Sequence, residues 1–109
     1  MKIKSFLLIL LIFIISKINF SFADEAQMKK GLEIFNETAG CAACHVLKAA
    51  GSEGNIGPNL DTVQGLSYES VMDIVTHGLG VMPAFGEDEI LSKEEIDIVT
   101  YYVVNAAVK

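Results

Sequence analysis

Three segments of the chain carry apolar or small residues at helical spacing, which places them on one face of each predicted helix. The first segment has such residues at i, i+3, i+4 and i+7, namely Met28, Gly31, Leu32 and Phe35. The second has its apolar stripe at Val71, Ile74, Val75 and Leu79. The third has its stripe at Ile96, Val99, Val103 and Ala106. The pattern predicts three amphipathic helices.

Capping and turn residues delimit these helices. The first helix is expected to end at residues 38–40, Thr-Ala-Gly. Ser67 is the expected N-cap of the second helix, and Gly78 and Gly80 mark its C-terminal end. Residues 92–95, Ser-Lys-Glu-Glu, read as a capping box for the third helix.

The rest of the sequence predicts loops and no β-strands. Residues 49–61 are rich in Gly, Asn and Pro and predict a loop between the first and second helices. No strand pattern, internal repeat or second domain is visible in the sequence. The sequence therefore predicts an all-α fold.

The amino-terminal residues have the pattern of a secretory leader. Two lysines open the chain, residues 6–15 are an unbroken apolar run, and residues 21–23, Ser-Phe-Ala, offer small residues at positions −3 and −1 of a signal-peptidase site. The alternative is an uncleaved anchor, but a spanning helix needs about 20 apolar residues, and Lys17 interrupts the segment. We predict a signal peptide over residues 1–23 and a single domain over residues 24–109, with no membrane span after cleavage.

Charge is divided unevenly between the leader and the rest of the chain. All fourteen Asp and Glu residues follow Ala23, whereas Lys2, Lys4 and Lys17 belong to the leader, and there is no arginine. Residues 24–109 thus hold five lysines against fourteen acidic residues, a net charge of −9. The lack of a basic cluster argues against nucleic acid as a partner. The acidic balance indicates either a partner with a basic docking patch or simply solubility.

The motif at residues 41–45, Cys-Ala-Ala-Cys-His, carries the strongest chemical signal. Cysteines at this spacing can bind the two vinyl groups of one porphyrin, and the histidine that follows can be the proximal ligand of its iron. The alternatives are a structural disulfide, a thioredoxin-like redox pair and half of a zinc site. A redox pair is expected in a βαβ setting, which the pattern lacks, and zinc would need two more ligands. We predict one haem c, bound covalently through Cys41 and Cys44, with His45 on the iron.

A second axial ligand would decide the chemistry of such a haem. Met82 precedes Pro83 in a glycine-flanked loop, and the proline biases Met82 to an extended conformation that holds its thioether out from a rigid turn. Met28 and Met72 lie on or beside helix stripes and are expected to pack in the core. His77 is expected at the surface, at a helix end. Met82 is the expected sixth ligand, and a Met/His pair is associated with a high reduction potential.

From about residue 27 to residue 107, the chain resembles the small monohaem class I c-type cytochromes. The resemblance depends on the order and spacing of a set of positions: Gly31, Phe35, residues 41–45, residues 57–60 (Gly-Pro-Asn-Leu), residues 82–85 (Met-Pro-Ala-Phe), Val99 and Tyr102. It implies three to four helices wrapped around one covalently attached haem. It also implies that the terminal helices cross where Gly31 meets Tyr102.

The resemblance assigns further roles around the haem. The carbonyl of Pro58 would accept a hydrogen bond from His45 Nδ1–H and so orient the imidazole. Leu60, Met72 and Phe85 would line the haem pocket. The implied cofactor-binding residues are Cys41, Cys44, His45, Met82, Pro58, Leu60 and Phe85, and the implied iron ligands are His45 and Met82.

Together these features predict an electron-transfer protein rather than an enzyme. The leader and the attachment of c-type haem outside the cytoplasm both predict the periplasm. We expect a monomeric one-electron carrier between a dehydrogenase or quinol-oxidising complex and a terminal acceptor. Two alternatives stay open: a tightly bound cytochrome subunit of a periplasmic dehydrogenase, and a haem enzyme or gas sensor, which would require Met82 to be absent from the iron.

Overall fold

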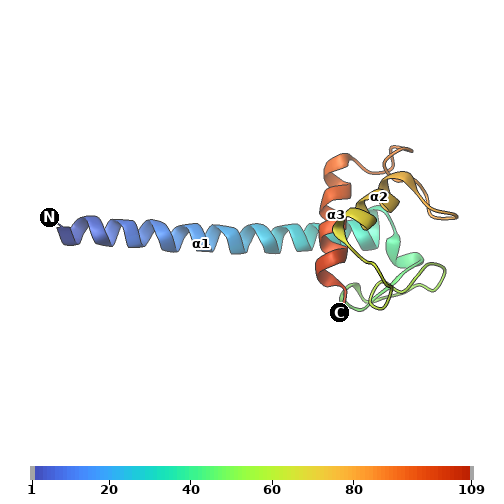
Figure 1. Cartoon of the computed structure of the whole chain (residues 1–109), viewed down its shortest axis with the longest axis horizontal. Helices are drawn as coiled ribbons and strands as arrows, with labels where there is room; N and C mark the ends of the chain where they lie inside the picture. The colour runs from blue at the N-terminus through green and yellow to red at the C-terminus, as the bar shows by residue number, and fades with distance from the viewer. Residues whose placement is uncertain (1, 109) are drawn as a thin grey trace.

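Three helices form the frame of the molecule. A computed structural model describes residues 2–108 and their side chains, except the side chains of residues 2 and 11–21. The helices are α1 (Lys2–Glu33), α2 (Tyr68–His77) and α3 (Lys93–Ala106). Only the last turns of α1 belong to the globular part, where α3 crosses them, and the rest of α1 projects away as a single rod (Figure 1). The predominantly helical architecture confirms the predicted fold class.

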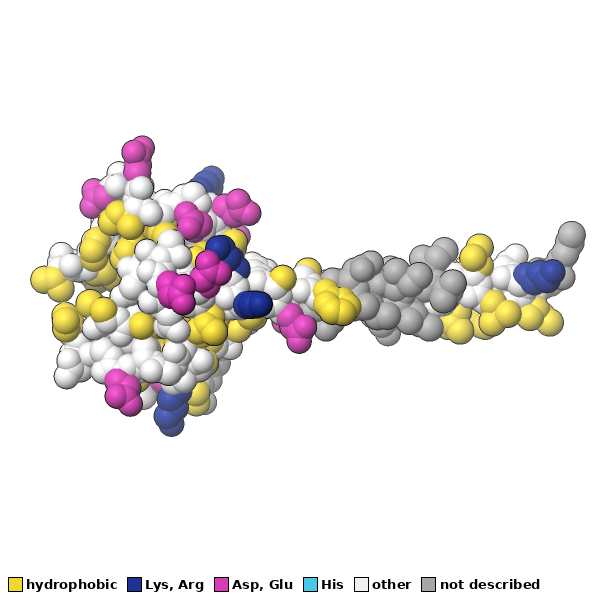
Figure 2. Space-filling view, turned by 180° about the vertical axis from the view of Figure 1, so that it is seen from behind, with side chains coloured by type: hydrophobic (Ala, Val, Ile, Leu, Met, Phe, Trp, Pro, Cys, Tyr) yellow, Lys and Arg dark blue, Asp and Glu magenta, His cyan; other side chains and the backbone are white. Residues whose placement is uncertain are grey.

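The predicted leader coincides with the projecting part of α1. Its residue 1 and the side chains of residues 11–21 lie outside the described part of the chain. Among the helices that the structure does describe, none is both long enough and apolar enough to cross a membrane. Figure 2 shows acidic side chains spread over the globular part, while apolar side chains and lysine gather toward the far end of the rod.

The first helix ends in a wider turn. A π-helical turn, η1 (Ile34–Thr38), follows α1 directly and buries Ile34 and Phe35 completely. Gly40, with φ of 71°, then takes the left-handed conformation that glycine adopts without steric cost, and the chain turns into a short 3₁₀ helix, η2 (Cys41–Ala43). The helix end predicted at residues 38–40 is confirmed.

The terminal helices cross at Gly31. A Cβ atom at this position would overlap the Cβ of Tyr102 and lie 3.2 Å from the carbonyl oxygen of Ile98. The rings of Phe35 and Tyr102 pack next to this point, with centroids 6.0 Å apart and planes tilted by 58°. The contact between Gly31 and Tyr102 that the family resemblance implied is confirmed.

Both predicted capping residues start their helices. The Ser67 hydroxyl accepts a hydrogen bond from the Ser70 N–H at 3.1 Å, and Ser92 Oγ accepts one from the Glu95 N–H at the same distance. At the other end of α2, Gly78 has φ of 76° and stops the helix. Leu79 therefore lies beyond α2 and is largely exposed, so its assignment to the helix stripe was wrong.

The loop after η2 contains a two-stranded antiparallel ladder that the sequence pattern did not predict. Strand β1 (Val46–Leu47) pairs with β2 (Ser52–Glu53) across the short 3₁₀ helix η3 (Lys48–Ala50). Ser52 Oγ accepts a hydrogen bond from the Leu47 N–H at 2.9 Å and stabilises this turn. Two residues per strand are too few to show an alternating pattern, which explains the miss.

The core lies between the end of α1, α2, α3 and the loops. Its buried apolar residues are Ile34, Phe35, Leu47, Val75, Phe85, Leu91, Ile96, Val99, Tyr102, Val103 and Ala107. The α3 face predicted from periodicity is largely confirmed, because three of its four residues are buried and Ala106 is half-buried. Val75, Phe85, Val99 and Val103 also border an internal cavity, so the core and that cavity share their walls.

Candidate functional site

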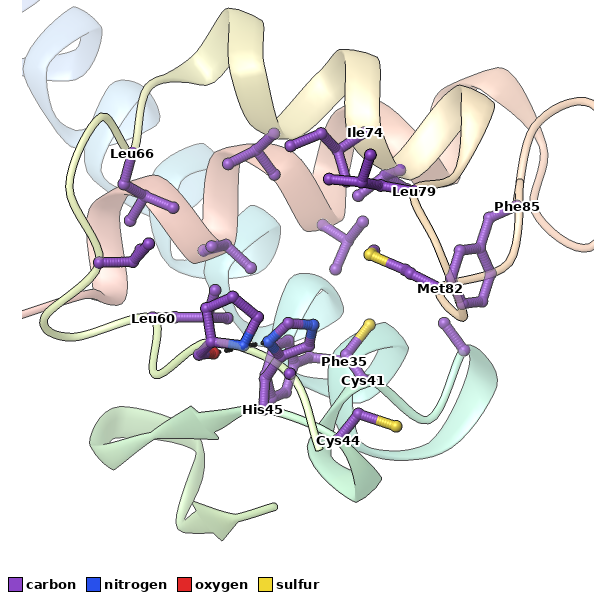
Figure 3. Close-up of a pocket in the computed structure, with 18 of the residues that line it drawn as sticks. Phe35, Cys41, Cys44, His45, Leu60, Leu66, Ile74, Leu79, Met82 and Phe85 are labelled. Atoms are coloured by element: carbon purple, nitrogen blue, oxygen red, sulfur yellow. Dashed lines mark hydrogen bonds between the residues drawn. The ribbon is translucent and has the colours of Figure 1, made fainter. Parts of the chain in front are cut away.

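An apolar cavity of about 460 Å³ opens into the globular part. Seven sequence-predicted site residues line it: Cys41, Cys44, His45, Pro58, Leu60, Met82 and Phe85 (Figure 3). They come from two walls, which we call the His45 wall (residues 40–60) and the Met82 wall (residues 79–85). Among the described residues that line the cavity there is no Asp, Glu, Lys or Arg. Such a volume is typical of a site for an organic cofactor.

Met72 and His77, two other residues that could have bound the iron, lie outside the cavity. Met72 packs half-buried against the core and does not line the cavity, so its predicted place in the pocket was wrong. Its neighbours Val71 and Ile74 are the α2 residues that line the cavity. His77 is exposed at the end of α2, where its Nδ1 lies 2.5 Å from a carboxylate oxygen of Glu87. Its predicted surface position is confirmed.

The turn at η2 brings the thiols and the imidazole together. The N–H groups of Cys44 and His45 both donate to the Cys41 carbonyl, at 3.1 and 3.0 Å. This tight turn presents Cys41 and His45 to the same cavity, and the Cys44 thiol lies next to them (Figure 3). Both cysteines are free thiols.

A hydrogen bond of its Nδ1 atom holds the imidazole of His45 in place. Its Nδ1 lies 2.7 Å from the carbonyl oxygen of Pro58, as the family resemblance implied. A carbonyl only accepts hydrogen bonds, so Nδ1 must carry the proton and donate it. The lone pair is then on Nε2, the nitrogen left free to bind a metal. The Pro58 segment is held in turn, because Gly57 N–H donates to the Cys44 carbonyl at 2.7 Å and Leu60 N–H to the Val46 carbonyl at 3.0 Å.

The Met82 wall is shaped by its backbone. Leu79 and Met82 exchange two backbone hydrogen bonds, with lengths of 3.2 and 3.0 Å. The N–H of Phe85 donates to the Val75 carbonyl at 2.9 Å, and its ring is buried. This turn directs the thioether of Met82 into the cavity, toward the space that the His45 imidazole enters from the other wall (Figure 3).

The Cys41 thiol has an altered acidity. Its pKa is raised to about 11, chiefly by burial; a backbone hydrogen bond opposes this rise, and the nearby Cys44 adds the smallest contribution. Cys41 is therefore a neutral thiol at physiological pH. Reactive cysteines of redox pairs have a lowered pKa instead. The environment of Cys41 thus disfavours the thioredoxin-like interpretation of the motif.

These groups fit a c-type haem. Two thiols and a histidine of defined tautomer lie at one side of a wide apolar cavity, and a thioether enters it from the other wall. The model of the family described as cytochrome c oxidase, cbb3-type, subunit III matches residues 26–103. The chain belongs to the small monohaem class I c-type cytochromes.

Individual relatives agree with this membership. The c-type cytochrome is 33% identical over 112 residues to cytochrome c6 of Gloeothece citriformis, covering 98% of this chain and 94% of the relative. It is 34% identical over 94 residues to the chloroplastic cytochrome c6 of Chlamydomonas reinhardtii, covering 78% of this chain and 58% of the relative. A similar solved structure is that of the c-type cytochrome SorU from Sinorhizobium meliloti, with a TM-score of 0.67 and 43% identity over 78% of this chain and 95% of that one.

Membership of the c-type cytochrome family establishes the general function of the protein. The protein is an electron-carrier haem protein with a covalent c-type haem, and its partners are redox proteins. Cys41 and Cys44 belong to the attachment motif of this c-type cytochrome.

Sequence reasoning missed several residues of the site. Ile56, Val63 and Leu66 line the cavity but stand between polar or glycine residues, where no helical period reveals them. Val81 also lines the cavity and lies in the loop beside Met82. Their only signal in the sequence is that each is an apolar residue inside a loop. Gly57 was noted only as part of a motif, and its contact with the His45 ring appears only in three dimensions.

Proposed function

We propose that this c-type cytochrome is a periplasmic one-electron carrier whose haem iron has His45 and Met82 as its axial ligands. The observation that carries the proposal is the pair of walls: an imidazole with a free Nε2 and a thioether enter one charge-free cavity from different segments. When bound, the haem supplies an iron centre that exchanges single electrons.

His45 would be the proximal ligand. The hydrogen bond from Nδ1 to Pro58 holds the proton on the outer nitrogen and raises the electron density of the ring, which strengthens Nε2 as a donor. Cys41 and Cys44, attached to the same turn, would fix the porphyrin edge beside this imidazole.

Met82 would close the opposite axial position. A neutral thioether favours reduced over oxidised iron more than a second imidazole does, so we expect a potential in the upper part of the cytochrome range. Apolar residues that line the cavity, among them Val71, Ile74 and Val99, would keep water from a bound haem. With both axial positions occupied, an electron can pass without a ligand binding or leaving.

The sequence supports the proposed location. The secretory pattern over residues 1–23 supports export with removal of the leader, which leaves residues 24–109 as one monomeric domain. We propose that its electron donor is a dehydrogenase or quinol-oxidising complex, that it passes electrons to a terminal acceptor, and that it catalyses no reaction of its own. A second candidate is a cytochrome held within a larger enzyme, which the name of the matching family model, that of an oxidase subunit, favours.

Absorption spectra of the matured protein test the ligation. We expect a low-spin c-type spectrum in both redox states and the weak methionine–iron charge-transfer band in the oxidised state. Met82→Ala should lose the band and bind cyanide or carbon monoxide readily, whereas the control Met72→Ala should keep it. A high-spin wild-type spectrum, or a band that survives Met82→Ala, would contradict the assignment. Recovery of the protein without a stoichiometric partner at high salt would favour the free carrier over the subunit.

A further inference from the structure

Gly57 lies directly against the ring of His45. A Cβ atom at position 57 would lie 2.5 Å from the ring Cε1, 2.9 Å from Nδ1 and 3.0 Å from Nε2. Apart from Gly57 itself and its two neighbours in the chain, the three heavy atoms nearest to this position all belong to His45. Real Cβ atoms essentially never approach other atoms this closely. A side chain at position 57 and the present position of the ring therefore exclude each other.

The backbone gives no other reason for a glycine at this position. Glycine is often required where φ is positive, because other residues are strained there. The described glycines with positive φ are Gly40, Gly51, Gly65, Gly78 and Gly80, and Gly57 is not one of them. At position 57 an alanine would therefore not be opposed by a positive φ, and the nearest atoms that oppose it are those of the imidazole.

The segment that contains Gly57 is tied in place on both sides. Its own N–H donates to the Cys44 carbonyl at 2.7 Å, and the N–H of Leu60 donates to the Val46 carbonyl at 3.0 Å. The next carbonyl, that of Pro58, accepts the bond from His45 Nδ1. Because these bonds hold the segment, an added methyl group would move the ring rather than the backbone.

One hydrogen bond does not fix the plane of an imidazole. The Nδ1–Pro58 bond sets the position of one ring atom but lets the ring tilt about the axis of that bond. The backbone of Gly57, packed against the ring beside Nδ1, Cε1 and Nε2, removes this freedom. The two neighbouring residues thus act together, one through its carbonyl and the other through its missing side chain.

We propose that Gly57 is a positioning residue that sets the plane of the His45 imidazole and thereby the direction of its Nε2 lone pair. The inference rests on the proposed role of His45 as an axial ligand. It predicts that the smallest possible side chain at position 57 changes how the imidazole meets the iron, while the overall fold is kept.

The test compares Gly57→Ala with a matched glycine variant. Gly86 also lacks a positive φ, and a Cβ there would lie 2.9 Å from a methyl carbon of Thr76 and 3.1 Å from one of Ile96, away from His45. The g-values of the oxidised holoprotein in electron paramagnetic resonance depend on the plane of an axial imidazole. We expect Gly57→Ala to shift these g-values and the reduction potential, and Gly86→Ala to keep the wild-type values. Wild-type g-values and potential in Gly57→Ala would overturn the proposal.

A second comparison applies if Gly57→Ala does not accumulate. In a His45→Gly background the ring is absent, so adding Gly57→Ala should cause no further loss of the soluble apoprotein. A further loss as large as in the wild-type background would overturn the proposal. A wrong assignment of the axial ligands would give a different result from a wrong role for Gly57. In that case the wild-type protein itself would lack the low-spin spectrum.

Discussion

The two walls of the cavity hold their ligands in different ways. On the His45 wall the ligand side chain itself is bonded, through the 2.7 Å contact of Nδ1 with the Pro58 carbonyl. On the Met82 wall the described hydrogen bonds join backbone groups only, and the thioether is directed by the turn that carries it. One ligand is positioned by its own contacts and the other by the shape of a loop. A perturbation of the structure should therefore detach Met82 from the haem iron before it detaches His45.

The largest expected effect comes from removing each ligand in turn. His45→Ala should nearly abolish mature holoprotein, because the attachment motif and the proximal ligand are lost together. Met82→Ala should keep the covalent haem but become high-spin and reactive toward carbon monoxide. Haem staining of denaturing gels, which detects only covalent haem, and visible spectra separate the two outcomes. Equal loss of covalent haem in both variants would contradict the proposed difference between the walls.

A change in the turn before Met82 should weaken that wall without touching the ligand. Gly78 has φ of 76° and ψ of 169°, a region open essentially to glycine alone, and a Cβ there would lie 2.8 Å from the Met82 carbonyl oxygen. Gly78→Ala should lower the free energy of unfolding by about 3 kcal/mol and weaken the methionine–iron band.

Gly80 is the control for this change. It also has a positive φ, of 59°, but a Cβ there meets no atom within 4 Å. Gly80→Ala should cost about 1 kcal/mol and keep the band. Denaturant unfolding followed by absorbance gives both quantities, and equal losses in the two variants would show that the contact with Met82 is irrelevant.

Low pH should destabilise the His45 wall through protonation of Asp61. Its carboxylate accepts bonds from the N–H groups of Val108 at 3.0 Å and Lys48 at 2.9 Å, and these bonds lower its pKa, with the Val108 bond as the largest cause. A lowered folded pKa means that the contribution of Asp61 to stability is complete above the ordinary value of 3.8 and disappears as the pH falls through the lower, folded value.

Asp61→Asn tests this dependence. The variant should be less stable than wild type at pH 7, and the difference should shrink toward zero at the acid end. Urea unfolding at several pH values measures it. Asp97→Asn, which changes an exposed carboxylate on α3, should show no such convergence. A difference between wild type and Asp61→Asn that stays constant with pH would refute the account.

A rise in pH should have the smallest effect on stability, and it should act through His77, next to the Met82 wall. The hydrogen bond to Glu87 is the main cause of the raised pKa of His77, and the Asp73 carboxylate at 3.7 Å adds to it. A raised folded pKa means that this stabilisation is complete below the ordinary value of 6.5 and is lost as the pH rises through the higher, folded value. The pair is exposed, so the loss is small.

The readout for His77 is the melting temperature of the oxidised protein across neutral to mildly alkaline pH. Wild type should show a slight fall over this window, and Glu87→Gln should flatten it. An identical fall in the variant would assign the effect to other groups.

The two walls also differ in how far the sequence predicted them. The attachment motif and the caps at Ser67 and Ser92 were predicted because each depends on neighbours in the chain or on fixed spacing. The bond between His45 and Pro58 and the crossing at Gly31 join distant residues and were implied only by the family resemblance. Met82 was placed in a loop facing the cavity because proline and glycine restrict that segment.

The errors have a common physical origin. Met72 was assigned to the pocket, although the neighbouring Val71 faces the cavity, and one residue along a helix turns the side chain by about 100°. Leu79 continued the helical period past Gly78, but the positive φ of that glycine had already ended α2. The β1–β2 ladder depends on pairing across a turn rather than on local preference. Each miss concerns how segments meet, which a one-dimensional pattern does not record.

The crossing of α1 and α3 joins distant parts of the chain. Gly31 belongs to the first helix of the domain and Tyr102 to the last, so their contact forms only when nearly all of the domain is present. Contacts between such distant residues make closure a late and comparatively slow event. We therefore expect the turn with Cys41 and Cys44 to be accessible to the machinery that attaches the haem until the terminal helices cross.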